Sequence, residues 1–276
     1  MRITSTRNPL IGYLRSLERA QVRREEGVYL VEGVRLVREA LDSAQCASLV
    51  LYDPDSLSRT AAGSELLAAV PAWAERVVEA DGRILAAAGQ TETPAGIIAV
   101  LRTPEPPPFE ETASGPFGVI LDRLGDPGNA GTILRTADAL AVDYVITTPG
   151  TVDLYSPKVV RAGMGAHFRL ALYPHLSWPT IRPALSSVAL VATVAREGIS
   201  VFRFSWPERS ALIIGSESHG LSDEAQAAAD LRVHLPMRPG VESLNAAIAA
   251  SVAMYLALGP RWPEKRSVTD SSDRRS

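Results

Sequence analysis

The chain has 276 residues, of which 46% are apolar and 21% charged, a composition typical of soluble globular proteins. This excludes a disordered chain and a fibrous repeat, and the length predicts two domains, each large enough to bury a core. The formal net charge of -3 leaves no global positive field. A nucleic-acid partner would therefore have to be bound by a local basic segment.

A single cysteine, Cys46, excludes an internal disulfide, and the four histidines show no metal-ligand spacing. The opening segment, residues 1–20, lacks the uninterrupted apolar core of a signal peptide. No window approaches the roughly 18 apolar residues that a membrane span requires. We therefore expect a cytoplasmic protein without a metal site and without a membrane-spanning segment.

The first 24 residues are strongly basic, with six arginines against a single glutamate. Apolar residues recur at helical spacing from Pro9, which predicts an amphipathic helix with a basic face. Two interpretations stay open: a solvated helix face, or a surface that binds RNA phosphates. The six arginines are Arg2, Arg7, Arg15, Arg19, Arg23 and Arg24.

Short apolar runs alternate with helical patterns over residues 1–101, which predicts a small α/β domain. Strands are expected at 28–32, 48–52, 75–80 and 96–101, and helices at 33–44 and 56–70. The next segment, 102–116, contains five prolines and no apolar periodicity. It is predicted to be an interdomain linker.

A second alternation occupies residues 117–262 and predicts a second α/β domain. Strands are expected at 117–122, 144–148, 169–173, 188–195, 211–215 and 231–236, and helices at 130–141, 156–166, 222–229 and 242–258. Strands this continuously apolar are typical of a mostly parallel sheet covered by helices on both faces. The polar residues 263–276 are predicted to form a disordered tail.

Ligands of parallel α/β sheets bind beyond the carboxyl ends of the strands. The candidate site therefore lies in three loops, which follow residues 117–122, 211–215 and 231–236. The first loop holds Gly125, Gly128 and Gly131, a spacing that differs from the G-x-G-x-x-G of dinucleotide binding. The second holds Ser218 and His219 but lacks the G-x-S-x-G turn of a serine hydrolase. Both of those enzyme classes are disfavoured.

Three segments in these loops resemble the three motifs of the SpoU, or TrmH, family of RNA ribose 2'-O-methyltransferases, in the SPOUT superfamily. They are N-A-G-T-I-L-R (129–135), G-S-E-S-H-G (215–220) and P-M-x5-S-L-N (236–245). The segment 152–166 resembles the family too. Ser216 departs from the family, which usually carries asparagine there, and this puts one contact near the methyl donor in doubt.

The first domain is similar to the family's N-terminal substrate-binding module through residues 3–9 and 29–41. The resemblance implies a small α/β domain akin to certain ribosomal RNA-binding proteins, followed by a catalytic domain that contains a trefoil knot. Knots are otherwise nearly absent from proteins. The resemblance also implies a homodimer, and the last predicted helix offers Ile248, Val252 and Tyr255 as an apolar stripe for that contact.

The resemblance implies S-adenosylmethionine as the cofactor and RNA as the partner, with 23S ribosomal RNA as the expected substrate. Cofactor binding is implied for Gly215, Leu235, Met237 and Leu244, because an apolar slot with close backbone approach suits adenine. Plain core packing is the alternative role of the two leucines. Substrate binding is expected of four arginines: Arg7, Arg23, Arg24 and Arg161.

The chemistry must activate a ribose hydroxyl, which is a very weak acid. Arg135 occupies the position of the family's essential arginine. A guanidinium stays protonated in proteins, so we expect Arg135 to stabilise the developing alkoxide or to clamp a phosphate. Four short polar side chains are expected to orient the hydroxyl and to take its proton: Asn129, Glu217, Ser243 and Asn245. The identity of the general base stays open, as does a purely structural role for Glu217.

Two other functions stay open beside the 23S ribosomal RNA methyltransferase. A transfer RNA 2'-O-methyltransferase shares the chemistry, but such members tend to flank the catalytic domain with basic helices rather than a full α/β module. A noncatalytic RNA-binding protein would keep only the fold. The intact Asn129, Arg135 and Ser243 argue against the latter.

Overall fold

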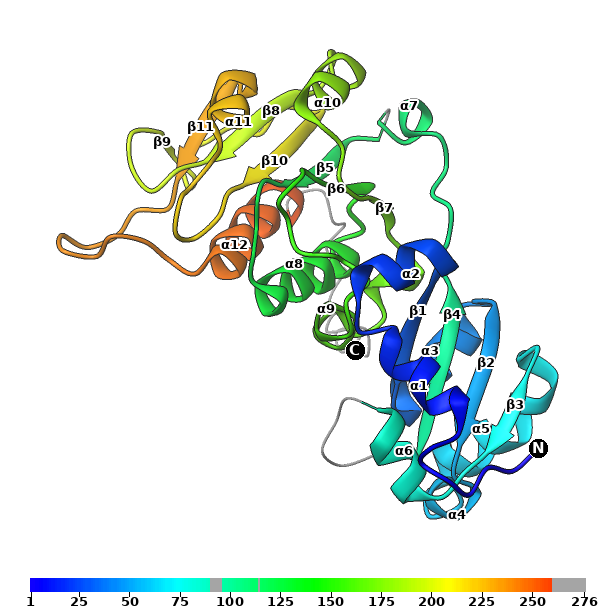
Figure 1. Cartoon of the computed structure of the whole chain (residues 1–276). Coiled ribbons are helices and arrows are strands. Elements are labelled where there is room, and N and C mark those ends of the chain that lie inside the picture. The colour runs from blue at the N-terminus through cyan, green and yellow to red at the C-terminus, as the bar shows by residue number, and fades with distance from the viewer. Residues whose placement is uncertain (90–95, 114, 260–276) are drawn as a thin grey trace, which may run out of the picture.

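The structure is a computed structural model that describes residues 1–89, 96–113 and 115–259. The chain forms two α/β units, each built on its own sheet (Figure 1). The predicted tail, 263–276, lies outside the described residues. Within these ranges no helix is long and apolar enough to cross a bilayer. The same ranges hold no group of three histidine, cysteine or acidic side chains placed to bind a metal ion.

The N-terminal unit has a four-stranded sheet in the order β1-β4-β2-β3. Its strands are β1 (Val28–Glu32), β2 (Ala47–Tyr52), β3 (Val77–Glu79) and β4 (Ile97–Arg102). Its helices are α1 (Pro9–Ser16), α2 (Ala20–Glu26), α3 (Val34–Asp42), α4 (Pro54–Leu57), α5 (Ala61–Trp73) and α6 (Gly82–Ala88). β4 pairs antiparallel with β1 and β2, and β2 pairs parallel with β3. α1 and α6 cover one face, and α3 and α5 cover the other.

The basic N-terminal segment forms two short helices rather than one. The side chain of Asn8 caps α1 by accepting from the backbone N–H of Leu10, and Pro9 occupies the first turn, where no intrahelical donor is needed. α2 ends at Gly27, whose φ of +62° suits a residue without a Cβ. The apolar side of α1 is buried against the sheet, so most of the arginines remain on the outside.

The predicted linker packs on the C-terminal unit over part of its length. It contains the short helix α7 (Phe109–Thr112), and the ring of Phe109 lies 5.0 Å from that of Tyr173. The Tyr173 hydroxyl donates to the carbonyl of Pro107 at 2.7 Å. These contacts fix a segment in which composition alone predicts no structure.

The C-terminal unit has a seven-stranded sheet in the order β7-β6-β5-β10-β8-β11-β9, and every pairing is parallel. Its strands are β5 (Phe117–Leu121), β6 (Tyr144–Thr147), β7 (Ala171–Tyr173), β8 (Ala189–Thr193), β9 (Ile199–Ser200), β10 (Ser210–Ile214) and β11 (Leu231–His234). Its helices are α8 (Pro127–Ala139), α9 (Pro157–Gly163), α10 (Trp178–Ala184), α11 (Asp223–Ala228) and α12 (Ala246–Leu258), with a 3-10 turn, η1 (Ala166–Phe168). The predicted parallel sheet is confirmed. The trefoil knot stays a prediction.

The strand order reverses direction between β5 and β10. The chain first adds β6 and β7 on one side of β5, and then builds β8, β10 and β11 on the other side. α8, α9 and α12 cover one face of this sheet, and α10 and α11 cover the opposite face. A crevice for ligands is expected where the order reverses, at the carboxyl ends of the strands.

The two units pack against each other (Figure 1). β1 lies next to α9, and a single buried apolar cluster continues from the α3 and α5 side of the first sheet into the layer of α8, α9 and α12. This shared core gives the two units a defined relative position.

Candidate active site

A pocket opens at the carboxyl ends of β8, β10 and β11, next to the start of α12. Its lining comes from residues 193–195 after β8, residues 214–217 and Gly220 around the end of β10, Leu235 and Met237 after β11, and Ser243, Leu244, Ala246 and Ala249. The lining is mainly apolar, with hydroxyl groups and backbone groups between the apolar side chains. A site of this character binds a flat heterocycle through its faces and edges.

The four residues expected to bind the cofactor all line this pocket. Leu235 and Met237 are half-buried and Leu244 is 39% exposed, so their apolar surfaces are available to a ligand. Leu235 also packs against the buried core, so for this residue the two expected roles coincide. The contribution of residues 193–195 escapes sequence reasoning, because nothing in the strand 188–195 distinguishes its carboxyl end from any other buried strand.

Gly215 is required by the loop that follows β10. The loop folds back on itself, with Ser216 and Gly220 exchanging backbone hydrogen bonds of 2.9 and 2.8 Å. A Cβ on Gly215 would lie 2.6 Å from the backbone of Gly220, closer than real Cβ contacts occur. The glycine thus allows the loop to close tightly at the edge of the pocket.

A polar network joins Asn129, Glu217 and Asn245 beside this pocket. Asn129 lies on the first turn of α8 and is 8% exposed; its Nδ2 donates to Glu217 Oε1 at 2.5 Å. Asn245 Nδ2 donates to the same Oε1 and to Asn129 Oδ1, both at 2.9 Å. The backbone N–H of Ala246 adds a third donor to Oε1 at 3.2 Å. Three loops distant in sequence therefore meet at one carboxylate.

Asn245 caps the last helix. Asn245 Oδ1 accepts hydrogen bonds from the backbone N–H groups of Ala247 and Ile248, in the first turn of α12. This helix begins at Ala246. The helix predicted from residue 242 thus begins four residues later. Ser243 lines the pocket, which leaves its hydroxyl available to a ligand.

Arg135 lies on the exposed side of α8. Six residues separate it from Asn129, which places the two side chains about 120° apart around the helix axis and about 9 Å apart along it. Across the described parts of the chain, Arg135 makes no hydrogen bond or ion pair. The next residue, Thr136, shares a hydrogen bond of 3.0 Å with Ser251 of α12. The structure thus separates Arg135 from the polar network of its own chain.

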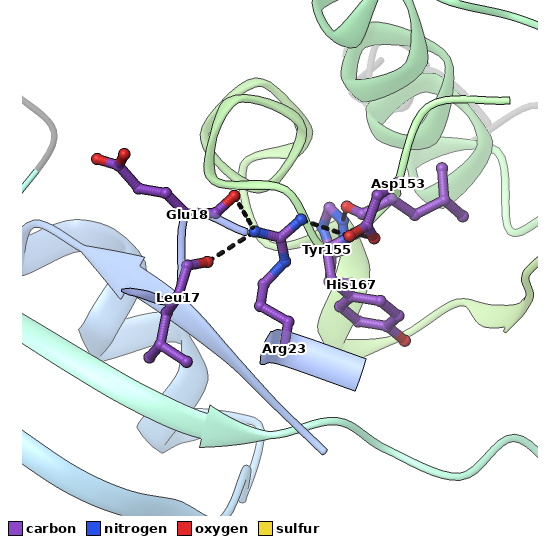
Figure 2. A network of polar contacts seen from close by, with 7 residues as sticks. Leu17, Glu18, Arg23, Asp153, Tyr155 and His167 are labelled. Carbon is purple, nitrogen blue, oxygen red and sulfur yellow. Dashed lines mark hydrogen bonds and ion pairs between the residues drawn. The ribbon is translucent and has the colours of Figure 1, made fainter. Parts of the chain in front are cut away.

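The expectation that Arg23 binds RNA is wrong. Its side chain is 3% exposed and donates to the carbonyl groups of Leu17 and Glu18 at 2.6 and 2.7 Å, and it forms an ion pair with Asp153 (Figure 2). Both terminal nitrogens of this guanidinium are engaged and the side chain is buried, so it has no accessible face for a phosphate. Sequence reasoning could not foresee this burial, because the acceptors of Arg23 are backbone carbonyl groups after α1 and a carboxylate of the other unit.

The other three substrate-binding candidates are placed differently. Arg7 and Arg24 are exposed on the N-terminal unit. Arg161 is half-buried on α9, and its Nη1 is buried without a hydrogen-bond partner among the described residues. The structure thus keeps Arg7 and Arg24 accessible to solvent.

Asp122 is a further residue of this region that sequence reasoning missed. It is 1% exposed at the end of β5 and accepts hydrogen bonds from Thr148, Trp178 and Ser222. Ser222 caps α11 and closes the loop that contains Glu217. One sequence feature could have identified Asp122: it is an aspartate directly after a buried apolar strand, where a charged side chain needs several hydrogen-bond partners.

Comparison with known proteins identifies the site. Residues 116–255 match the SpoU rRNA Methylase family, and residues 8–99 match the MRM3-like substrate binding domain. The chain belongs to the SpoU rRNA methylase family. The predicted activity, S-adenosylmethionine-dependent methylation of ribosomal RNA ribose hydroxyls, is thereby confirmed at the level of the family.

Two relatives of this SpoU chain are similar to it over nearly their full length. The 23S rRNA (guanosine(2553)-2'-O)-methyltransferase RlmP of Bacillus subtilis is 30% identical, covering 92% of this chain and 97% of the relative. The 23S rRNA (uridine(2479)-2'-O)-methyltransferase of Streptomyces viridochromogenes is 31% identical, covering 97% and 95%. The crystal structure of the SpoU methyltransferase AviRb from the same organism, in complex with AdoMet, superposes with a TM-score of 0.83 at 29% identity, covering 92% and 98%. The predicted S-adenosylmethionine cofactor is confirmed.

Proposed function

We propose that this SpoU enzyme transfers a methyl group from S-adenosylmethionine to a ribose 2'-hydroxyl of 23S ribosomal RNA. The observation that carries the proposal is the polar network of Asn129, Glu217 and Asn245 beside an apolar pocket. Two relatives are named for this reaction on 23S ribosomal RNA. Arg7 and Arg24 offer exposed positive charge for the RNA on the unit that matches a substrate-binding domain.

The pocket suits the cofactor chemically. Leu235, Met237 and Leu244 offer apolar surface for an adenine ring, and the backbone of Gly215 closes the edge of the slot. The bound cofactor supplies a methyl group on a positively charged sulfonium. Ser243 and Ser216 add hydroxyl groups to the lining. Ser216 thus keeps a hydrogen-bonding group where the family usually has asparagine.

In this proposal Glu217 accepts the proton of the ribose hydroxyl. Its Oε1 is fixed by three donors, whereas its Oε2 has no hydrogen-bond partner within the described residues. Asn129 and Asn245 therefore orient the carboxylate and leave one oxygen free. A positioned base of this kind contributes roughly 10²- to 10⁴-fold to a rate. The proton passes from the hydroxyl to Glu217 as the oxygen–carbon bond forms, while the bond from the methyl carbon to the sulfonium sulfur breaks and leaves a neutral thioether.

Arg135 serves this proposal as a fixed positive charge. Guanidinium groups do not act as bases in proteins. Arg135 has no partner among the described side chains that would neutralise its charge. It is free to stabilise the developing alkoxide or to hold the neighbouring phosphate with its planar donor fork. Either role lowers the energy of the transition state without requiring contact with the cofactor.

We also propose a homodimer that forms through α12 and the exposed side of α8. Ile248 and Tyr255 are each 56% exposed, an unusual state for large apolar side chains on a surface helix. Ala253 and Ala257 of the same helix are buried in their own unit, so they are not available to a neighbouring copy. Arg135 lies on the adjoining helix, one residue from the contact between α8 and α12. A second copy would therefore lie near the arginine.

Mapping of ribose methylation tests the function. Total RNA is taken from a strain that lacks this enzyme and is incubated with the purified enzyme and S-adenosylmethionine. Methylated riboses are then located as reverse-transcription stops at low nucleotide concentration. The expected result is one restored methylation in 23S ribosomal RNA. Restoration in transfer RNA alone would contradict the proposed substrate. Absence of heat on titration with S-adenosylmethionine would instead favour a noncatalytic RNA-binding protein.

A further inference from the structure

Arg23 is buried and connects the two units of the chain through an ion pair with the half-buried Asp153. Its Nη1 donates to the carbonyl groups of Leu17 and Glu18, which follow α1, and its Nη2 pairs with the carboxylate of Asp153 in the C-terminal unit (Figure 2). A charge is retained in a buried position only where such partners replace its hydration. The corner between α1 and α2 is therefore tied to one carboxylate of the C-terminal unit.

Asp153 is itself fixed to the helix that supports the active site. Its Oδ1 accepts a hydrogen bond from the backbone N–H of Tyr155. Its backbone carbonyl accepts one from the backbone N–H of Ser156, the residue that precedes α9. α9 packs directly on α8: a Cβ on Gly131 of α8 would lie 2.4 Å from the Cβ of Ala162 of α9. The connection from the α1–α2 corner thus continues, through closely packed groups, to the helix that bears Asn129.

Arg169 makes a second connection between the units. Its guanidinium pairs with Glu39 of α3 at 2.8 Å and with Asp138 of α8 at 2.6 Å. Gly165, with a φ of +89°, allows α3 to approach, because a Cβ there would lie 2.4 Å from the carboxyl carbon of Glu39. One side chain therefore joins the N-terminal unit to the same helix, α8, that the first connection reaches.

Aromatic rings fill the space between the units. Tyr29 of β1 is fully buried, with its ring centroid 5.0 Å from that of Tyr155 and 6.5 Å from that of His167. Close-packed interiors do not deform continuously, so rings packed in this way resist sliding of one unit on the other. The interface thus combines ion pairs at two positions with a packed apolar centre.

We propose that Arg23 and Arg169 are positioning residues that lock the N-terminal unit onto the C-terminal unit of the same chain, and that this fixed geometry selects the nucleotide that is methylated. The exposed Arg19 and Arg24 belong to the corner that Arg23 ties down. RNA bound at that corner is held at a constant separation from the pocket. Only a ribose at the matching position along the RNA reaches the methyl group. The selection step rests on the proposed function, whereas the lock itself does not.

A distance measurement tests the lock in the full chain. Cys46 is the single cysteine, is exposed and lies in the N-terminal unit, so one added cysteine at the exposed Ala227 of α11 gives a pair of spin-label sites. The unaltered interface should give a narrow distance distribution. Arg23→Met combined with Arg169→Gln should broaden it. An unchanged narrow distribution in the double variant would overturn the lock.

The controls break surface ion pairs between an arginine and a carboxylate of the same unit. Arg102→Met removes the pair with Glu75, and Arg182→Gln removes the pair with Asp230. Both controls should keep the narrow distribution. If Arg23→Met does not fold, Asp153→Asn with Arg169→Gln breaks the same two connections with an isosteric change at the buried site, and it decides the question by the same measurement.

Methylation mapping on the same variants tests the selection step. Loss of the lock should lower kcat/KM for RNA on the order of 10- to 100-fold and spread methylation to neighbouring riboses, because misplacement of a reacting group has effects of that size. Affinity for S-adenosylmethionine should not change. A broadened distance distribution with wild-type kcat/KM and an unchanged methylated site would overturn the selection step. Failure of the unaltered chain to methylate ribosomal RNA would contradict the proposed function alone, since the distances still decide the lock.

Discussion

Asn129 and Glu217 lie 88 positions apart in the chain and share a hydrogen bond of 2.5 Å. They meet because β5 and β10 are parallel neighbours, so the loops that follow them leave the same edge of the sheet. Asn245 approaches from the start of α12 and completes the network. The strand order thus converts three sequence motifs into one site.

Glu217→Gln tests whether the carboxylate takes the ribose proton. Glutamine keeps the shape and one acceptor oxygen but cannot accept a proton, so single-turnover methylation should fall by roughly 10²- to 10⁴-fold. Affinity for S-adenosylmethionine should stay close to wild type. If Glu217 only supports its loop, cofactor affinity should fall instead and the single-turnover rate at saturation should persist. Titration calorimetry on the same protein separates the two outcomes.

Gly215→Ala tests the closed loop at the edge of the pocket. The added methyl group would overlap the backbone of Gly220 at 2.6 Å, so the loop must open and cofactor affinity should fall by at least about tenfold, a loss of about 1.4 kcal/mol. Gly125→Ala is the matched control, because a Cβ there meets no atom within 4 Å. It should bind S-adenosylmethionine like the wild type. Equal affinities in the two variants would contradict the role of the loop.

The sequence predicts the fold well where apolar periodicity is strong, and poorly where short elements depend on tertiary contacts. The buried strands β5 and β6 lie within the predicted segments, and β10 begins one residue before its predicted segment. α10 was missed because Pro179 and Pro183 interrupt its helical pattern, although its Trp178 and Ile181 are buried against the sheet. The two-residue strand β9 has no periodicity to detect.

The candidate site shows a similar division. Motif order alone brings together Asn129, Glu217 and Asn245, because loops after parallel strands converge. Burial of individual arginines could not be predicted. Arg23 and Arg24 are neighbours of the same type, yet one is buried and the other exposed, because the partner of Arg23 is 130 positions away. That pairing exists only after the two units have docked.

Exposed arginines of the N-terminal segment should set the salt dependence of RNA binding. Replacement of Arg7, Arg19 and Arg24 by glutamine removes three charges without touching the buried side of α1. The slope of log affinity against log salt should flatten by about 2 on single-stranded RNA, at about 0.7 per phosphate contact. Filter-binding measurements of RNA affinity over a series of salt concentrations give this slope.

The control for this series removes the same charge elsewhere. Arg59, Arg203 and Arg232 are exposed arginines outside the N-terminal segment, and their replacement by glutamine should leave the slope near the wild-type value. Identical slopes for the two triple variants would show that the basic segment is only a solvated face.

His167 should make the docked structure sensitive to acid. Burial lowers the pKa of His167 to about 4, below its ordinary value of 6.5, although the hydrogen bond to the Leu154 carbonyl opposes the shift. The unfolded chain therefore binds this proton more tightly, and stability present at neutral pH is lost as pH falls from about 6.5 towards 4. At about pH 5 the loss is about 2 kcal/mol.

Denaturant unfolding of His167→Gln measures this contribution. The drop in unfolding free energy between about pH 7.5 and about pH 5 should be smaller than in the wild type by about 2 kcal/mol. His175→Asn is the control, since His175 is exposed and asparagine tolerates its φ of +60°. An equal pH dependence in wild type and His167→Gln would show that another group is responsible.

Arg135→Ala tests the electrostatic role of the arginine. If the guanidinium stabilises the developing alkoxide, turnover should fall by roughly 10²- to 10³-fold, the usual effect of removing one well-placed donor. Cofactor affinity and melting temperature should not change, because Arg135 is exposed and has no partner among the described residues. Arg135→Lys should recover only part of the rate, since an ammonium keeps the charge and loses the planar fork.

Three measurements on the same Arg135→Ala protein separate the possible roles: single-turnover methylation, cofactor affinity and melting temperature. A structural role predicts an earlier melt and weak binding of S-adenosylmethionine. A role as general base predicts loss of the rising alkaline limb of the pH profile, whereas an electrostatic role keeps that limb at lower amplitude. Thr132→Ala, on the same exposed side of α8, controls for changes in the helix and should retain wild-type turnover. Wild-type turnover in Arg135→Ala itself would contradict the proposed mechanism.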